Sequence, residues 1–256
     1  KTADSICQVY MDKVPNSLGA RNCTSLSERI RQRSWSMEAE KHALPEKPFC
    51  FFFRYRNIGE AEAAKWAVYT EVAKLDPNEY RENARSNYGE KLIKWLKSHS
   101  ETVAEKSFEV PNPKDFREHS IELPMEGLPI GTYVLFTGSD SKLSTNKDVV
   151  SYAIVTVTGL ALISRTENDG ETVLRVVSRD SGKPIAQAKI ELLSLVYNRK
   201  TRSNDYVLAQ TLTTDQNGEA VWKGQAQNYR GYMVDVYHGD DKLITAGNVY
   251  GRSSKE

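Results

Sequence analysis

The sequence predicts a mainly β protein: two tandem immunoglobulin- or fibronectin-like β-sandwiches with a short N-terminal helical hairpin and one inserted helix. Three observations favour this fold class. Short segments rich in β-branched and aromatic residues recur from residue 34 to residue 249, separated by Gly, Asn, Asp and Pro. Apolar residues recur at helical spacing in residues 1–33 and 77–98. The length of 256 residues suits about two domains, each with its own core.

Residues 1–33 predict two helices, because apolar residues recur at helical spacing on both sides of Pro15-Asn16-Ser17. Ser17 is the predicted N-cap of the second helix. The pattern is similar to the tail of a tetratricopeptide-type helical repeat, and the alternative is a hairpin packed on the first sandwich. The apolar residues are Ile6, Val9 and Tyr10 in the first helix and Leu18, Cys23, Leu26 and Ile30 in the second.

Residues 34–158 predict the first sandwich. Trp35, Met37 and Ala39 alternate with polar residues, and an aromatic strand follows at 49–55. Residues 64–72 fit a strand or part of a helix, because their apolar residues do not alternate cleanly. Residues 77–98 predict an amphipathic helix over the sandwich, with Tyr88, Leu92, Trp95 and Leu96 at helical spacing. The remaining predicted strands are 105–110, 117–123, 132–137 and 149–162.

Residues 159–256 predict the second sandwich. The β-branched stretch 149–162 contains Gly159, where a strand could bend, and we place the domain boundary there. The later strands are expected at 172–178, 184–194, 207–213, 220–223, 231–238 and 243–249.

Two turns are predicted to shape the second sandwich without carrying chemistry. In the first, Gly182 is free to take a positive φ and Pro184 ends the turn before an alternating strand. In the second, Asp215 bonds back to nearby backbone and Gly218 relieves the reversal. With Gly159, these are the residues to which we assign structural roles.

Charge and hydropathy exclude several classes of partner. Lys plus Arg number 35 and Asp plus Glu number 34, so no net field attracts nucleic acid or an acidic membrane. No apolar run approaches the roughly 18 residues of a membrane-spanning helix, and no leader is recognisable. The chain begins without Met and ends on a polar tail, so we expect it to be part of a longer protein.

The three cysteines, Cys7, Cys23 and Cys50, form no C-x-x-C pair, which argues against a zinc or redox motif. Cys7 and Cys23 could form a disulfide across the helical hairpin, or they could be two small buried side chains. Cys50 lies in an apolar run and is expected in the core.

No catalytic, cofactor-binding or metal-binding residue is expected, and therefore no enzyme activity. The histidines His42, His99, His119 and His238 lie in different predicted elements, with no i, i+4 pair and no nearby Cys. Asp115 and Glu118 precede His119, but neighbours in a strand point to opposite faces, which argues against an acid–base pair. Phosphate-binding loops and the G-x-S-x-G and H-E-x-x-H patterns are absent.

Four pieces of the sequence carry a family resemblance: Phe53-Arg-Tyr-Arg-Asn57, Leu128-Pro-Ile-Gly-Thr-Tyr-Val134, Val155-Thr-Val-Thr-Gly-Leu-Ala161, and Asp180-Ser-Gly-Lys-Pro-Ile-Ala-Gln-Ala188 followed by Thr214-Asp-Gln-Asn-Gly218. In this order they resemble the N-terminal macroglobulin-like domains of a bacterial alpha-2-macroglobulin family protein of the kind encoded by Bacteroidetes. The resemblance covers about residues 34 to 250. No Cys is followed by the family's Gly-Glu-Gln thioester pattern, so covalent capture cannot reside in these residues.

This resemblance implies a non-catalytic part of a shell that traps or inhibits proteases, located in the periplasm or at the cell surface. It implies other macroglobulin-like domains of the same chain as partners, and proteases as targets. Arg199-Lys-Thr-Arg202 could be cut by trypsin-like proteases, although a solvated loop explains it as well. Two alternatives stay open: an adhesion or carbohydrate-binding module, which exposed aromatics on one sheet face would favour, and a carrier domain of an outer-membrane export or uptake system.

Overall fold

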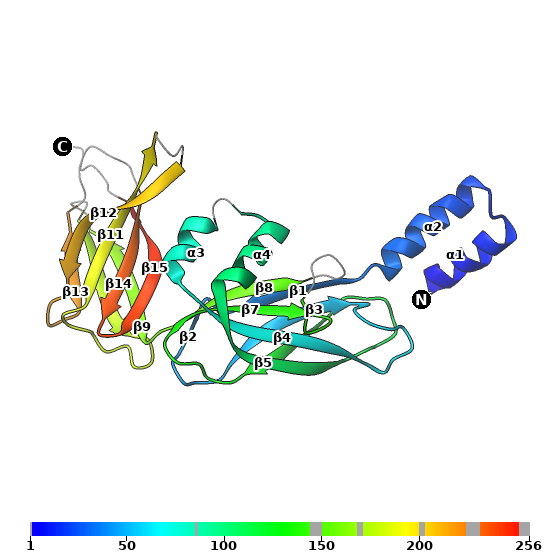
Figure 1. Cartoon of the computed structure of the whole chain (residues 1–256), viewed down its shortest axis with the longest axis horizontal. Coiled ribbons are helices and arrows are strands. Elements are labelled where there is room, and N and C mark those ends of the chain that lie inside the picture. Colours follow the sequence, from blue (N-terminus) through cyan, green and yellow to red (C-terminus); the bar gives the residue numbers. More distant parts are fainter. Residues whose placement is uncertain are drawn as a thin grey trace.

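A computed structural model of the chain describes residues 2–84, 87–143, 150–167, 171–199, 203–223 and 231–250. Its elements form a helical hairpin, a first sandwich with a helical excursion, and a second sandwich, arranged along one long axis (Figure 1). The mainly β, immunoglobulin-like fold class is therefore confirmed.

The helical hairpin consists of α1 (Thr2–Lys13) and α2 (Leu18–Arg31) and extends away from the first sandwich (Figure 1). Ser17 caps α2 by accepting a hydrogen bond from Ala20 N, as predicted. The predicted apolar stripe does not form the contact between the helices, because Ile6, Val9 and Tyr10 are exposed. The helices instead meet through a polar and small-residue face that includes Asp4, Cys7, Ala20 and Ser27, all buried.

The first sandwich has a three-stranded sheet in the order β1-β3-β6 and a five-stranded sheet in the order β2-β8-β7-β4-β5. The main core lies between them and includes Phe51, Phe53, Val72 and Leu135. The strands are β1 (Ser34–Ala39), β2 (His42–Ala43), β3 (Phe49–Arg56), β4 (Lys65–Leu75), β5 (Ser100–Pro111), β6 (His119–Met125), β7 (Gly131–Gly138) and β8 (Ser151–Val157).

The inner strands β4 and β7 of the five-stranded sheet are buried on both faces over much of their length. One face packs on the three-stranded sheet, and the other packs against Leu92, Ile93 and Leu96 of α4 (Glu90–His99). A strand covered on both sides has no polar face, so its sequence does not alternate. This is why residues 64–72 could not be assigned from periodicity, although they lie in β4 apart from Ala64.

The predicted single helix at 77–98 is two helices. Pro77 and the N-cap Asp76 begin α3 (Pro77–Asn83), which ends before α4 begins at Glu90. Cys50 is also not in the core: the buried side chains of β3 are Phe49, Phe51, Phe53 and Tyr55, so Cys50 points to the opposite, exposed face.

The second sandwich packs a three-stranded sheet, β13-β10-β9, against a four-stranded sheet, β12-β11-β14-β15. Its core is separate from that of the first sandwich: Val157 belongs to the first core, and Leu160 belongs to the second. The strands are β9 (Leu160–Thr166), β10 (Thr172–Ser178), β11 (Lys189–Asn198), β12 (Ser203–Thr213), β13 (Glu219–Trp222), β14 (Gly231–His238) and β15 (Asp241–Tyr250).

The bounds of several predicted strands of this region differ: β12 begins four residues earlier than the predicted 207–213, and β13 and β15 differ from 220–223 and 243–249 by one or two residues. The expected strand 149–162 is β8 and β9, which lie in different sheets on the two sides of Thr158-Gly159. The expected strand 184–194 begins at Lys189, and Pro184 forms one isolated bridge with Val177. Pro184 lacks a backbone N–H, which disfavours a longer ladder there.

Candidate functional site

The connection between the sandwiches is held by the Asp241 carboxylate, at the start of β15. Thr158 Oγ1 donates to Asp241 Oδ1 at 2.7 Å, and Gly159 N donates to Asp241 Oδ2 at 2.8 Å. Thr158 Oγ1 also accepts from Leu160 N at 3.0 Å. Charge-assisted hydrogen bonds of this kind are stronger than neutral ones. The predicted boundary residue Gly159 is therefore a backbone donor to a carboxylate of the second sandwich.

Arg179 and His42 lie beside this connection. Arg179 N donates to Gly159 O at 2.7 Å, and Arg179 Nε donates to Leu160 O at 3.2 Å. Burial lowers the pKa of the Arg179 guanidinium, opposed by the charges of Asp241 and Glu40. Burial also lowers the pKa of His42, and the positive charges of Arg179 and Lys41 lower it further. The junction thus favours a neutral imidazole at His42.

A second connection is an ion pair between α3 and the second sandwich, which we call the α3 ion pair. Arg81 NH1 of α3 lies 2.7 Å from Asp235 Oδ2 of β14, and the two side chains are 12% and 1% exposed. Asn78 Oδ1 accepts from Arg81 NH2 at 2.8 Å, and the guanidinium lies 4.9 Å from the ring centre of Tyr206. A pair this deeply buried depends on both partners being present.

The α3 ion pair was not predicted from the sequence. Arg81 lies in a charged helix and looks like a solvent-facing residue. The available signal was Asp235, a lone carboxylate in the otherwise apolar β14 sequence Tyr-Met-Val-Asp-Val-Tyr, because a buried charge requires a partner. Its partner is 154 residues away in the sequence, so spacing could not identify it.

The first predicted turn has the expected backbone geometry. Gly182 has a φ of +69°, and its N–H donates to Ser178 O at 2.8 Å. Asp180, at the start of the turn, lies 2.6 Å from Lys47 Nζ of the first sandwich. Both side chains of this second ion pair are more than half exposed.

The second predicted turn is tightly enclosed. Gly218 has a φ of +72°, and a Cβ on it would lie 2.6 Å from Val176 O. Asp215 Oδ1 accepts from Asn217 N and Glu219 N, each at 2.9 Å. Gly218 O accepts from Val176 N at 2.8 Å, so this turn is fixed to β10.

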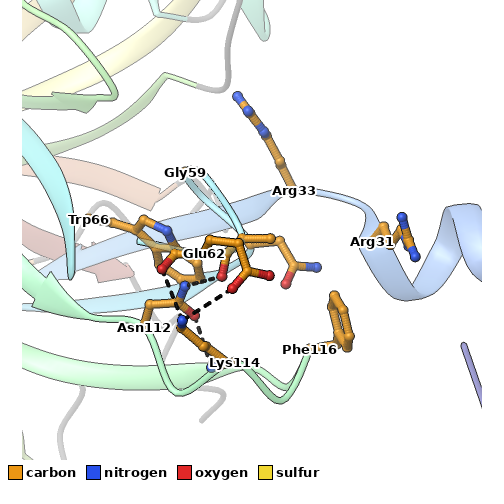
Figure 2. A pocket seen from close by; sticks show the side chains of 10 residues that line it. Arg31, Arg33, Gly59, Glu62, Trp66, Asn112, Lys114 and Phe116 are labelled. Atoms are coloured by element: carbon orange, nitrogen blue, oxygen red, sulfur yellow. Dashed lines mark hydrogen bonds and ion pairs between the residues drawn. The ribbon is translucent and has the colours of Figure 1, made fainter. Parts of the chain in front are cut away.

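A pocket of about 390 Å³ lies at the opposite end of the first sandwich, beside the end of α2 (Figure 2). Its polar groups contact one another: Asn112 Nδ2 donates to Ala63 O at 2.8 Å, Lys114 Nζ donates to Glu62 O at 2.9 Å, and Trp66 Nε1 donates to Glu60 O at 2.8 Å. These bonds hold the loop before β4 against the segment after β5. These contacts make the pocket a joint between loops.

The same joint holds the helical hairpin. Asn57 Nδ2 donates to Ile30 O at 2.8 Å and to Gln32 O at 3.3 Å, and so binds carbonyls at the C-terminal end of α2. Asn57 has a φ of +52°, a conformation that Asn tolerates better than most residues. Arg31, which lines the pocket, is bound to Asp4 at 2.8 Å.

The fold resembles alpha-2-macroglobulin. A crystal structure of native alpha-2-macroglobulin from Escherichia coli spanning domains MG0-NIE-MG1 matches 83% of this chain with a TM-score of 0.57 and 12% sequence identity. This chain spans 63% of that structure, and 12% of the chain in the cryo-EM reconstruction of the whole Escherichia coli protein, where the TM-score is 0.42. A transglutaminase from red sea bream matches with a TM-score of 0.41 and 10% identity.

These likenesses concern the fold. The sequence matches no protein-family model, and a search of curated proteins gives no match. The two Escherichia coli chains are longer than this one, which corresponds to a part of each.

The histidines are dispersed, but one of them has a partner that the sequence did not suggest. His119 Nε2 lies 2.9 Å from Asp115 Oδ1, because Asp115 lies in a turn before β6 rather than in the strand. The expectation that these side chains stay apart was wrong. The contact lowers the pKa of Asp115, with a backbone N–H from Arg117 adding to the effect. In the described ranges, no three His, Cys, Asp or Glu side chains could hold a metal ion.

In the part of the chain that the structure describes, exposed aromatic side chains do not gather on one sheet face. Among the described residues, those with large exposed fractions are Tyr10, Tyr88 and Tyr197, in α1, the segment before α4, and β11. Of the basic loop 199–202, Arg199 is exposed and the other three residues lie outside the described part of the chain. No helix in the described ranges is long and apolar enough to cross a membrane.

Proposed function

We propose that this chain is a non-catalytic, structural part of an alpha-2-macroglobulin-like protein, and that its two sandwiches are shell domains of a protease-trapping or protease-inhibiting assembly. The observation that carries the proposal is the fold likeness to the Escherichia coli alpha-2-macroglobulin fragment over 83% of the chain. The family resemblance of the turn and strand sequences supports it independently. The assembly would act in the periplasm or at the cell surface.

The junction between the sandwiches suits such a role. A shell domain must hold its neighbours at a defined angle, and here the two sandwiches share the Asp241 hydrogen bonds and the buried α3 ion pair. Two separated contacts between two bodies resist rotation better than a single peptide linker. The polar groups of the pocket in Figure 2 are likewise used to fix loops to one another.

The proposal is tested with the longer protein that contains this chain. We expect it to suppress cleavage of a protein substrate by an added protease, while cleavage of a small peptide substrate continues, because a shell excludes only large substrates. The isolated chain of 256 residues is the control and should inhibit neither reaction. Unchanged cleavage of the protein substrate by serine, cysteine and metalloproteases alike would rule out this function.

The isolated chain also tests the non-catalytic part of the proposal. We expect no turnover of ester or peptide substrates, because the sequence offers no recognised nucleophile motif and the α3 ion pair and the Lys47–Asp180 pair join the two sandwiches. If turnover is measurable, the double variant Asp115→Asn, His119→Gln locates its source. Turnover that persists in this variant would place the catalytic group elsewhere, and turnover that disappears would assign catalysis to Asp115 and His119.

A further inference from the structure

The two helices of the N-terminal hairpin pack with a register that polar contacts define. Ser27 Oγ donates to Asp4 Oδ1 at 2.6 Å, and Gln8 Nε2 lies 3.3 Å from Ser27 Oγ. Nearer the turn, Thr24 Oγ1 lies 3.1 Å from Met11 Sδ. Residues 4, 8 and 11 of α1 therefore share one face, and that face meets residues 24 and 27 of α2.

Cys7 and Cys23 occupy facing positions within this register. Cys7 lies between Asp4 and Met11 on the contacting face of α1, and it is 4% exposed. Cys23 precedes Thr24 on α2 and is partly exposed. Proximity to the Cys23 thiol, together with burial, raises the pKa of Cys7. Both cysteines are free in the structure.

From this geometry we propose that Cys7 and Cys23 form a disulfide that links α1 to α2 when the chain meets an oxidant. Because Cys23 is the more accessible thiol, its thiolate attacks a small disulfide such as oxidised glutathione and releases one glutathione thiolate. The Cys7 thiol then loses its proton and attacks Cys23 Sγ, releasing the second glutathione. Two protein thiols are oxidised, and one glutathione disulfide is reduced to two thiols.

The hairpin has a specific need for such a link. Of its described residues, the buried ones are Asp4, Cys7, Ala20 and Ser27, and none of them belongs to the cores of the two sandwiches. A pair of short helices with so little buried apolar surface is only marginally stable by itself. A disulfide between residues 7 and 23 restricts the unfolded hairpin and so favours the folded one. The inference rests on this geometry and does not depend on the proposed function.

Thiol titration of the folded chain in a glutathione redox buffer tests the proposal. The reduced chain has three thiols, at Cys7, Cys23 and Cys50. We expect oxidation to leave one thiol, the intact mass to fall by two hydrogen atoms, and a non-reducing peptide map to join the Cys7 and Cys23 peptides. In the matched Cys50→Ser variant, the count should fall from two to none.

The stability of the hairpin supplies a second measurement. Hydrogen exchange at the amides of α1 and α2 should slow on oxidation of the wild-type chain, while amides of the second sandwich stay unchanged. The Cys7→Ser and Cys23→Ser variants should show no such slowing. The proposal would be overturned if the thiols of Cys7 and Cys23 both stayed free in an oxidising buffer. In that case only Cys50 would react, by forming a mixed disulfide or by linking two chains.

Discussion

Gly182 and Gly218 have the same left-handed backbone conformation but different surroundings. Nothing lies within 4 Å of the position that a Cβ on Gly182 would take, whereas a Cβ on Gly218 would lie 2.6 Å from the backbone oxygen of Val176. At Gly182 an added side chain would be unfavourable only because residues other than Gly disfavour the left-handed backbone conformation. At Gly218 it would also require β10 or the turn to move, since a backbone atom cannot rotate away.

The two glycines therefore form a matched pair for substitution. We expect Gly182→Ala to lower the free energy of unfolding of the second sandwich by about 1 kcal/mol, and Gly218→Ala by roughly 3 kcal/mol or more. Urea unfolding followed by fluorescence measures both. Lys183→Ala, beside Gly182, serves as a control and should be nearly silent. Equal losses at the two glycines would contradict this account of the second turn.

His42 gives the junction a dependence on pH. Its pKa in the folded protein lies below the ordinary value of about 6.5, because of burial and the neighbouring charges of Arg179 and Lys41. The unfolded chain therefore binds a proton at a higher pH than the folded one does. The stability contributed by neutral His42 is fully present above about pH 6.5 and is lost as pH falls through the folded pKa.

Replacing His42 tests this sign. Between about pH 7.5 and about pH 5.5, we expect the wild-type chain to lose more stability than His42→Gln, since Gln does not titrate. Urea unfolding at both pH values gives the comparison, and the difference between the two proteins cancels the contribution of other groups. A larger loss in the variant would mean that the charged imidazole is the favoured form.

At the scale of single elements, the sequence predicted strands best where one face is polar. β10 and β14 have the predicted bounds, and the alternation of Trp35, Met37 and Ala39 correctly predicted β1. The prediction was ambiguous at β4 because helix α4 covers the face that would otherwise be polar. It failed for Cys50 because an apolar run was assumed to be buried on both sides.

The docking of helix α3 on the second sandwich depends on the α3 ion pair. We expect Asp235→Ala to destabilise the chain by about 3–5 kcal/mol, because the Arg81 guanidinium then stays buried without its carboxylate. The double variant Arg81→Met, Asp235→Leu should be more stable than either single variant, since it leaves no unpaired buried charge. Thermal and urea unfolding measure all three.

The exposed pair of Lys47 and Asp180 is the control for the α3 ion pair. It also joins the two sandwiches, but its side chains are 54% and 61% exposed. Lys47→Ala should therefore change stability by less than about 1 kcal/mol. If Lys47→Ala lowers the free energy of unfolding as much as Asp235→Ala does, burial does not decide how strongly these ion pairs stabilise the chain.

At the scale of the whole molecule, the order of hairpin, sandwich and sandwich was readable because each part has its own periodicity. The contacts that join these parts could not be predicted from the sequence. Residue pairs such as Arg81 with Asp235 and Thr158 with Asp241 lie 154 and 83 positions apart, and no local pattern connects them. The predicted turn residues could be identified because their chemistry is contained within four or five neighbouring positions.

The second sandwich is expected to fold alone. A fragment of residues 158–256 retains the complete core that begins at Leu160, together with the Thr158 and Asp241 contact. We expect a single cooperative thermal transition at a lower temperature than in the whole chain, because the fragment lacks Arg81 as the partner of Asp235. A melt without a cooperative transition would show that the two sandwiches form one folding unit.

The entry and exit of the helical excursion have an evolutionary consequence. Leu75 at the end of β4 pairs directly with Ser100 at the start of β5, and the ladder continues from there to Lys65 and Pro111. The segment 76–99 therefore leaves and rejoins the sheet at adjacent positions, as a tight turn would. A lineage could lengthen this arm without changing strand order or register, as long as α4 still covers the apolar face of the sheet. Because the arm also carries Arg81, such a change would move the contact with Asp235 of the second sandwich while the pairing of β4 with β5 stayed the same.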